Sequence, residues 1–439
     1  MIKIKKFIII YLPIFILLSI SLFYLYPKFK NKYYSTVIRL RLIESKLDTY
    51  EDYLIQDLES YQNTRNPSIA ISEIKDNIKF NWKELKVPWD KSKFEKTKAL
   101  TTWKGNLIVG LAGIEKGSAS IYLYNGKNWT ELLERKNLVN KGLEKLKYVT
   151  VLKVHNGELF AGIDNTVWKY NKKNEWVLIK TFKDKNFSEK PLAYSMESHN
   201  GFLYVGLLNI NSSIYRFNNS SWEDVSLGLA KHPNNGIYEL FSHSDGKLYA
   251  SNISTSGSTV VYYLDEKNIK FNAVGGKGIN GSWINNSFKW GLSFSSHKGM
   301  LFLTMLRHPI KYGNFSSIWA YDGKEWFAVG NNKTPSVWGE VNCFNSSLSY
   351  KGMLLIGAGG SPAGNASVWA LDNNQWNLIG GKGINQSWGK NFPHSLTKDF
   401  RNSNSEYPYR MIKWNNSVVV GFGHGPKTST LWQLKIINK

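Results

Sequence analysis

One pattern repeats along most of the 439-residue chain: an apolar strand after a turn of Gly or Asn, then an aromatic-rich strand, then a Trp. The clearest copies lie at 156–179, 200–225 and 351–379. Apolar and polar residues alternate within each copy, which is the period of a strand rather than a helix. Strands repeated at a spacing of roughly 40–60 residues are typical of a β-propeller, whose four-stranded blades surround a central channel. The pattern therefore predicts an all-β propeller.

The aligned copies form columns that set the number of blades. A hairpin turn precedes each second strand, where Gly or Asn takes a positive φ at low cost. The third strand carries an aromatic column at Tyr122, Trp168, Tyr215, Tyr262, Trp319, Trp369 and Trp432. The outer strand begins at Trp129, Trp176, Trp222, Phe271, Trp326 and Trp376. The columns predict a seven-bladed propeller of four-stranded blades over residues 78–439.

The last copy ends before it reaches an outer strand of its own. Ahead of the first copy, Asn81–Leu85 (NWKEL) matches Asn128–Leu132 (NWTEL) in four of five positions. We therefore expect the N-terminal strand around Trp82 to complete the final blade. This closure pairs a sheet edge that would otherwise be exposed, and it joins the two ends of the domain without a disulfide.

An apolar segment precedes the propeller. Residues 7–26 carry no charge and are long enough to span a bilayer, which takes about 20 residues. Three lysines precede this segment and the large domain follows it, which is the usual layout of a signal-anchored extracytoplasmic protein. We predict a single-pass transmembrane anchor within residues 1–32, with the propeller outside the cytoplasm at the cell envelope. A cleaved signal peptide is the alternative, and it would leave a secreted protein.

Residues 33–77 are expected to form an amphipathic helical stalk. Leu40, Leu47, Leu54 and Tyr61 recur every seven residues and share one helical face. One interpretation is a single helix that lies on the propeller or on the membrane. The other is a short coiled coil over residues 40–61, through which the protein self-associates.

Composition narrows the classes of function. The formal net charge is +23, but lysine is scattered through turns, so specific binding of nucleic acid is not expected. A general attraction to acidic polymers or anionic lipid stays open. Cys343 is the only cysteine, which excludes an internal disulfide and predicts a small buried residue. No motif for binding a metal or phosphate occurs, and none for nucleophilic catalysis, so neither a cofactor nor a metal is expected.

Loop length differs between the two faces of the predicted disc. Links from first to second strand and from third to fourth strand are short. Links from second to third strand and between blades are long, as at 307–315, 330–344 and 380–409. Because a propeller carries function on its elaborated loops, we expect a ligand to bind at this long-loop face, around the channel mouth.

Two of the long loops repeat one another. Gly275–Trp283 reads GGKGINGSW, Gly380–Trp388 reads GGKGINQSW, and a degenerate copy ends at Trp338. In one interpretation these tryptophans stack on sugar rings while Asn280 and Asn385 bond to hydroxyl groups. In the other, each Trp is a peg wedged between neighbouring blades.

Basic and imidazole side chains supply a second set of candidates. Those in or beside the long loops could hold an anionic group, with plain solvation as the alternative: Arg307, His308, Arg410 and His424. A separate group fills one hairpin column and is expected to pack on the tight-turn face: His155, His199, His243 and His297.

Carboxylates for acid–base chemistry would lie near the channel mouth. Glu197 and Glu239 fall on predicted inner strands, and Glu340 falls in a long loop. The sequence does not place them as the carboxylate pair that glycoside hydrolysis uses. Ordinary hydrogen bonding is the alternative role, so no catalytic residue is assigned.

Two segments carry a family resemblance: LLIGAGG…VWALDNNQW, within residues 354–376, and LIVGLAG…IYLYNGKNW, within 107–129. They resemble kelch-like propellers, and the GGKGIN-x-SW loop is similar to an element of bacterial secreted propellers of unassigned role. The resemblance implies a propeller with an interaction-type function. Two hypotheses follow: a membrane-anchored module that binds a carbohydrate or a protein, and a propeller-fold glycoside hydrolase or polysaccharide lyase.

Overall fold

The computed structural model describes residues 78–133, 145–183, 191–208, 211–230, 236–254, 258–283, 288–307, 316–331, 343–359, 366–372, 375–381, 383–388, 407–423 and 428–438. All of them lie within one compact unit, Tyr61–Lys439. The expected anchor at 7–26 and the expected helix at 40–61 fall outside the described residues. Within the described ranges, no helix is both long enough and apolar enough to cross a membrane.

The described chain is built of 28 strands and two short 3-10 helices, η1 (Lys91–Lys93) and η5 (Ile279–Gly281). The innermost strands are β2 (Phe94–Trp103), β6 (Val149–His155), β10 (Leu192–His199), β14 (Gly236–Ser242), β18 (Phe288–His297), β22 (Cys343–Tyr350) and β26 (Tyr407–Trp414). The second strands are β3 (Asn106–Gly113), β7 (Glu158–Ile163), β11 (Phe202–Leu208), β15 (Leu248–Ile253), β19 (Met300–Arg307), β23 (Met353–Gly359) and β27 (Ser417–Gly423).

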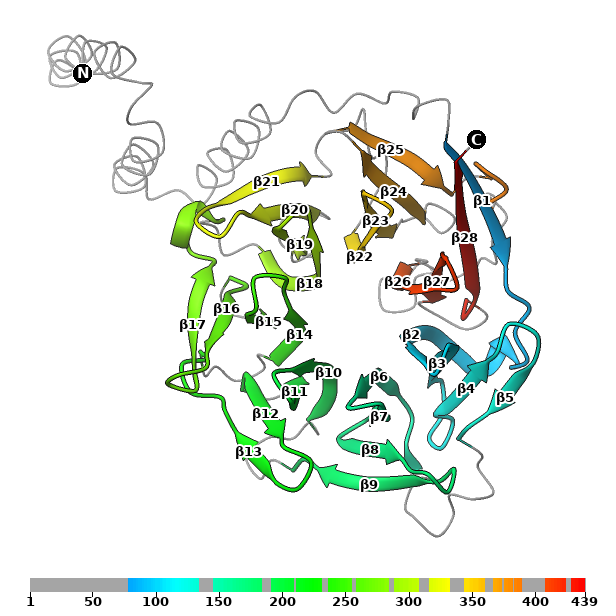
Figure 1. The fold of residues 1–439 in the computed structure, drawn as a ribbon, viewed down its shortest axis with the longest axis horizontal. Helices are drawn as coiled ribbons and strands as arrows, with labels where there is room; N and C mark the ends of the chain where they lie inside the picture. The colour runs from blue at the N-terminus through cyan, green and yellow to red at the C-terminus, as the bar shows by residue number, and fades with distance from the viewer. Residues whose placement is uncertain are drawn as a thin grey trace, which may run out of the picture. The chain divides into compact units, whose positions relative to one another are not determined.

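The third strands are β4 (Ser120–Tyr124), β8 (Thr166–Tyr170), β12 (Ser213–Phe217), β16 (Val261–Asp265), β20 (Ser316–Tyr321), β24 (Ser367–Asp372) and β28 (Leu431–Asn438). The outer strands are β5 (Trp129–Glu131), β9 (Trp176–Thr181), β13 (Trp222–Asp224), β17 (Lys270–Gly275), β21 (Trp326–Asn331), β25 (Gln375–Gly380) and β1 (Ile78–Glu84). Each set of inner, second, third and outer strand pairs antiparallel, and the sets stand around a common centre (Figure 1).

The N-terminal strand closes the structure in the way that its sequence predicts. β1 pairs antiparallel with β28 over its whole length, from Ile78 opposite Asn438 to Glu84 opposite Trp432. Because β28 also pairs with β27, the first described strand completes the last sheet. The two ends of the described chain are thus held side by side by backbone hydrogen bonds, and the edge of β28 is covered.

The hairpin turns between inner and second strands adopt the expected conformation. Lys104, Asn156 and Asn200 have φ near +50°, and each is followed by a glycine with φ near +78°. Two successive residues with positive φ match the twist of paired strands. These short links all lie at the same end of the sheets, which we call the tight-turn face.

The outer-strand tryptophans join neighbouring sheets by one repeated hydrogen bond. The indole Nε1 of Trp326 donates to the carbonyl of Val274 (2.9 Å), which lies on the preceding outer strand β17. Trp82 donates in the same way to Ile379 of β25 (2.7 Å), so it occupies the column position that the sequence assigns to it. Trp176 and Trp376 make the equivalent bonds to Leu132 and Val329.

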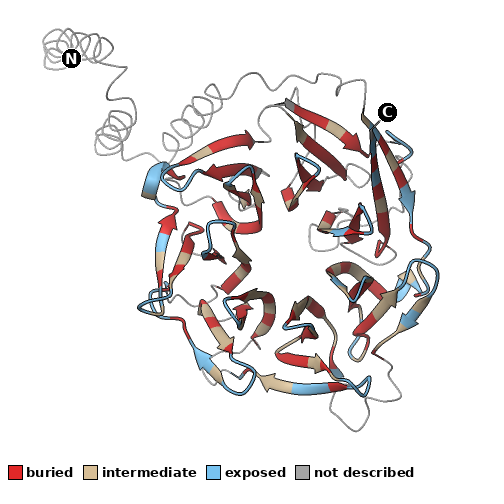
Figure 2. Ribbon diagram, in the orientation of Figure 1, coloured by how far each residue is buried: buried red, intermediate tan, exposed pale blue. Residues whose placement is uncertain are grey.

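The core is divided among the interfaces between sheets. One cluster joins Val368 of β24, Val420 of β27 and Phe80 of β1. Buried residues lie along the strands, and exposed residues gather at the turns between strands (Figure 2). Cys343 at the start of β22 is 2% exposed, as a small core residue should be, and burial raises the pKa of its thiol.

Candidate functional site

A register shift interrupts every described inner strand at the same level. In β10 the pairing with β11 jumps from Ala193 to Ser195, and in β14 the pairing with β15 jumps from Ile237 to Glu239. β26 makes the same jump from Pro408 to Arg410. A β-bulge of this kind leaves one residue out of the ladder and re-aims its side chain, and bulges gather beside binding sites. The sequence columns give no sign of these bulges.

Five of the bulged strands, β2, β6, β10, β14 and β26, line a small cavity between the innermost strands. Its volume is about 20 Å³, which is room for about one water molecule. Its polar lining comes from Lys98 of β2, Thr150 of β6, Tyr194 and Ser195 of β10, Tyr238 and Glu239 of β14, and Arg410 of β26. These residues lie up to about 300 positions apart in the sequence, and only the closure of the ring brings them together.

Lys98 is the most unusual side chain of this cavity. Its Nζ atom is buried and has no hydrogen-bond partner among the described residues. Nζ lies 3.0 Å from the centre of the Tyr194 ring and 5.0 Å from that of Tyr238, so the ammonium rests on two aromatic faces. Burial, followed by the charge of Lys96, holds the pKa of Lys98 well below its usual range, and Glu239 opposes this effect.

Glu239 and Arg410 form an ion pair across the cavity. Nη1 of Arg410 lies 2.7 Å from Oε1 of Glu239, and the Glu239 side chain is 8% exposed. Glu239 raises the pKa of Arg410, which therefore stays charged. The sequence singled out both residues separately, as a candidate acid and as a candidate anion binder, and the structure shows them as partners.

Glu197 has a cation partner of its own. Its Oε1 lies 2.6 Å from Nζ of Lys153, on the neighbouring inner strand β6. Glu197 and Glu239 each face a basic group, whereas glycosidases place two carboxyl groups on either side of the scissile bond. Glu340 lies outside the described residues.

The cavity tyrosines carry hydroxyl groups that keep their protons. Burial raises the pKa of Tyr238 to about 12 and that of Tyr194 well above its usual value. The two rings lie 4.9 Å apart. At neutral pH both hydroxyls keep their protons. Because the two hydroxyls bond to one another, only one proton of the pair is left for a further acceptor.

Trp283 and Trp388 lie inside the fold. They are 3% and 1% exposed, and their indole nitrogens donate to the carbonyls of Thr259 and Ala366. Trp283 packs edge-on against Trp326 at 5.4 Å, and Trp388 packs edge-on against Trp82 at 5.1 Å. A buried indole offers no face to a sugar ring, so these contacts support the interpretation of each Trp as a peg between blades.

Asn280 and Asn385 serve the same two loops. Both have φ slightly above +50°, and their side-chain amides donate to the carbonyls of Val274 and Ile379. These are the carbonyls that accept from Trp326 and Trp82. The GGKGIN-x-SW repeat is thus a clamp that fixes one blade to the next, and its glycines and asparagines are needed for the shape of the loop.

The other candidates from the long loops are only partly described. Trp338, His308 and His424 lie outside the described residues, and Arg307 is the last residue of β19. Of this group of basic and loop candidates, Arg410 is the one that the described structure places at the cavity. The sequence does not single out Lys98, because one lysine among the many in this chain carries no distinguishing pattern.

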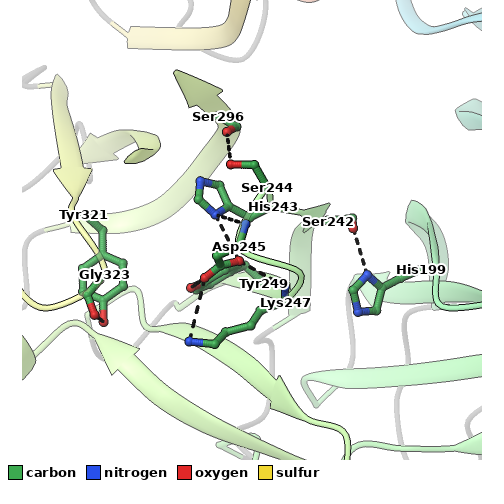
Figure 3. A network of polar contacts seen from close by, with 10 residues as sticks. All are labelled: His199, Ser242, His243, Ser244, Asp245, Lys247, Tyr249, Ser296, Tyr321 and Gly323. Atoms are coloured by element: carbon green, nitrogen blue, oxygen red, sulfur yellow. Dashed lines mark hydrogen bonds and ion pairs between the residues drawn. The ribbon is translucent and has the colours of Figure 1, made fainter. Parts of the chain in front are cut away.

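The four hairpin histidines lie on the tight-turn face and are 1–7% exposed, as expected for packing residues. They also bond across blades: Nδ1 of His199 lies 2.8 Å from Oγ of Ser242, and Nδ1 of His155 lies 2.9 Å from Oγ of Ser198 (Figure 3 shows the first). Beside His243, which contacts Asp245, Ser244 reaches Ser296 of the next sheet.

The same column joins blades even where the residue is not histidine. The indole nitrogens of Trp103 and Trp414 donate to the carbonyls of Gly157 and Gly105, each in the next sheet. A belt of inter-blade bonds therefore runs along the tight-turn face. The same face carries an open depression of about 290 Å³, lined in part by Lys104, Tyr350 and Lys413.

These sheets, closed around a centre by an N-terminal strand, define a protein of the β-propeller class. No family model matches the sequence, and a search of the curated proteins gives no match. The comparison with solved structures is informative about the fold. The extracellular domain of a putative hybrid two-component system from B. thetaiotaomicron is 12% identical, with a TM-score of 0.51 over 80% of this chain and 39% of that one.

Two further structures have similar scores. Virginiamycin B lyase from Staphylococcus aureus is 12% identical, with a TM-score of 0.52, over 81% of this chain and 99% of that one. YCF48, solved with a bound peptide, is 12% identical, with a TM-score of 0.50, over 84% of this chain and 99% of that one. The chain spans about two-fifths of the first of these proteins and nearly all of the other two. At this identity the likeness shows the fold alone.

Proposed function

We propose that the protein is a membrane-anchored, seven-bladed β-propeller that stands outside the cytoplasm and binds a carbohydrate or protein ligand. The ligand binds at the long-loop face and reaches the cavity between the innermost strands. The observation that carries this proposal is the cluster of Lys98, Tyr238, Glu239 and Arg410, which line the cavity beside the bulges of the inner strands. A ring held by buried tryptophans has no structural need for such a cluster.

The solved structures that resemble this chain are compatible with a binding function. One neighbour is an extracellular domain, and another was solved with a peptide bound. A lyase is also among the neighbours, so the fold alone does not decide between a binder and an enzyme. The ion pairs of Glu197 and Glu239 favour the binding module over a hydrolase that works with two carboxyl groups.

Ligand binding is tested with the full chain reconstituted in nanodiscs, by a glycan array and by pull-down from cell-envelope extracts. The informative variants are Arg410→Gln and Tyr238→Phe, and Lys173→Ala in an exposed outer turn is the matched control. We expect wild type and K173A to retain a ligand that both cavity variants weaken. A ligand that is lost instead on Lys413→Ala, in the depression of the tight-turn face, would contradict the proposed site.

The membrane topology has its own test, because the chain holds a single cysteine that is buried. Lys173→Cys introduces one exposed thiol on the propeller. We expect a membrane-impermeant maleimide to label this variant on intact cells and to leave wild type unlabelled. Labelling of K173C only after lysis would place the propeller in the cytoplasm.

A further inference from the structure

Two polar groups of the cavity lack a partner among the described residues. One is the Nζ atom of Lys98, and the other is the Oγ atom of Ser195, whose residue is 4% exposed. Both line the same cavity. Burying a polar group without a hydrogen bond costs free energy, so these two groups call for a partner that the described residues do not supply.

No carboxylate among the residues that line the cavity is bonded to Lys98. The cations near it are Lys96, on the same strand, and Arg410, on β26. Glu239 favours the charged form of Lys98, but it is already bonded to Arg410 at 2.7 Å. Arg410 and Glu239 thus neutralise one another, and a protonated Lys98 lacks an anionic partner among the residues that line the cavity.

The neighbouring donors suit an anion as well. The hydroxyls of Tyr194 and Tyr238 bond to one another and leave one proton for a further acceptor, and Ser195 offers a second hydroxyl. Hydroxyl groups and an ammonium group together form the donor set that oxygen anions prefer. Since the cavity has room for about one water molecule, a ligand can reach Lys98 only with an oxygen atom of a terminal group.

We propose that Lys98 binds an oxyanion, a carboxylate or phosphate group that the ligand presents to the cavity between the inner strands. This inference rests on the proposed function and names the chemistry of the ligand. The anion supplies the hydrogen bonds and the charge that Lys98 lacks. Because the anion favours the charged amine, binding draws a proton onto Lys98 at pH values where the empty site leaves that amine neutral.

The test uses the full chain in nanodiscs and isothermal titration calorimetry with acetate, inorganic phosphate and neutral acetamide at constant ionic strength. We expect one of the anions to bind and acetamide not to bind. Lys98→Met should weaken anion binding roughly 10–100-fold, the range expected for a hydrogen bond to a charged group. Lys153→Met, which removes another inner-strand cation, should leave it within a few-fold.

The proton uptake gives a second readout. Titrations above neutral pH in two buffers of different ionisation enthalpy should show net proton uptake by wild type and none by K98M. Preference for acetate identifies a carboxylate ligand, and preference for phosphate identifies a phosphate ligand. Equal binding by K98M, equal binding of acetamide, or no binding of either anion overturns the inference. If an anion binds at Lys98 but the protein captures no ligand from the cell envelope, the proposed function is wrong and the inference about Lys98 still holds.

Discussion

Replacing Lys98 by Met is expected to stabilise the protein. Met has nearly the length of Lys and keeps the contact with the Tyr194 ring, but it removes a buried donor that has no partner. Mutational data put the cost of such a donor at about 1–3 kcal/mol. For a domain of this size a gain of 1 kcal/mol raises Tm by roughly 1–2 °C, so K98M should melt roughly 1–5 °C above wild type.

The stabilisation of K98M relative to wild type should decrease as the pH rises above neutral. Burial lowers the pKa of Lys98 in the folded protein, so the unfolded chain holds the proton more tightly. The stability of the wild type therefore rises as the pH increases toward the ordinary lysine pKa of about 10.4. The advantage of K98M should therefore be largest near neutral pH and shrink above it. Thermal unfolding followed by circular dichroism at several pH values measures both effects.

A control separates this effect from the simple loss of a lysine. Lys153 is paired with Glu197, so Lys153→Met should not stabilise the protein. If K98M melts below wild type at neutral pH, Lys98 has a partner in solution and the reasoning about an incomplete site fails. If the difference in Tm between K98M and wild type does not decrease as the pH rises, the destabilisation does not come from the buried charge of Lys98, and the reasoning likewise fails.

Other predictions concern the ring itself. Burial lowers the pKa of His155 and His297, so their contribution to stability is present above about pH 6.5 and is lost as the pH falls below it; thermal unfolding between neutral and acidic pH checks this. A Cβ at Gly380 would lie 2.8 Å from the Trp82 ring, so Gly380→Ala should cost about 1–3 kcal/mol in urea unfolding, and a neutral result would contradict the clamp. Trp82→Ala should cost about 3–5 kcal/mol in the same assay and expose the edge of the last sheet, whereas an unchanged midpoint would mean that β1 does not hold the ring closed.

Much of the fold could be predicted from the sequence because each element repeats a local rule. The turn at Lys104 and Gly105 needs positive φ, and the same need recurs in every copy. The resemblance of the Trp82 segment to the Trp129 segment was enough to find a pairing between the two ends of the domain. Such features are visible in one sequence because they occur several times in it.

The candidate site could not be predicted in the same way, because it lies where the copies differ. The bulges change the register of a strand without changing its alternation of residues, so they leave no pattern to read. Lys98 differs from a surface lysine only in its surroundings, which come from other blades. The sequence did point to Arg410 and Glu239, but it could not show that they neutralise one another.

The two ends of the inner strands therefore have different roles. At the tight-turn face, residues such as His199 and Trp414 fix each sheet to the next, while Trp82 and Trp326 do so at the rim. An unpaired buried amine persists only where its surroundings are held in place by other contacts. The belt and the rim provide those contacts, so the fold can keep Lys98 at a cost in stability, and the partner that offsets this cost is the oxyanion that we propose.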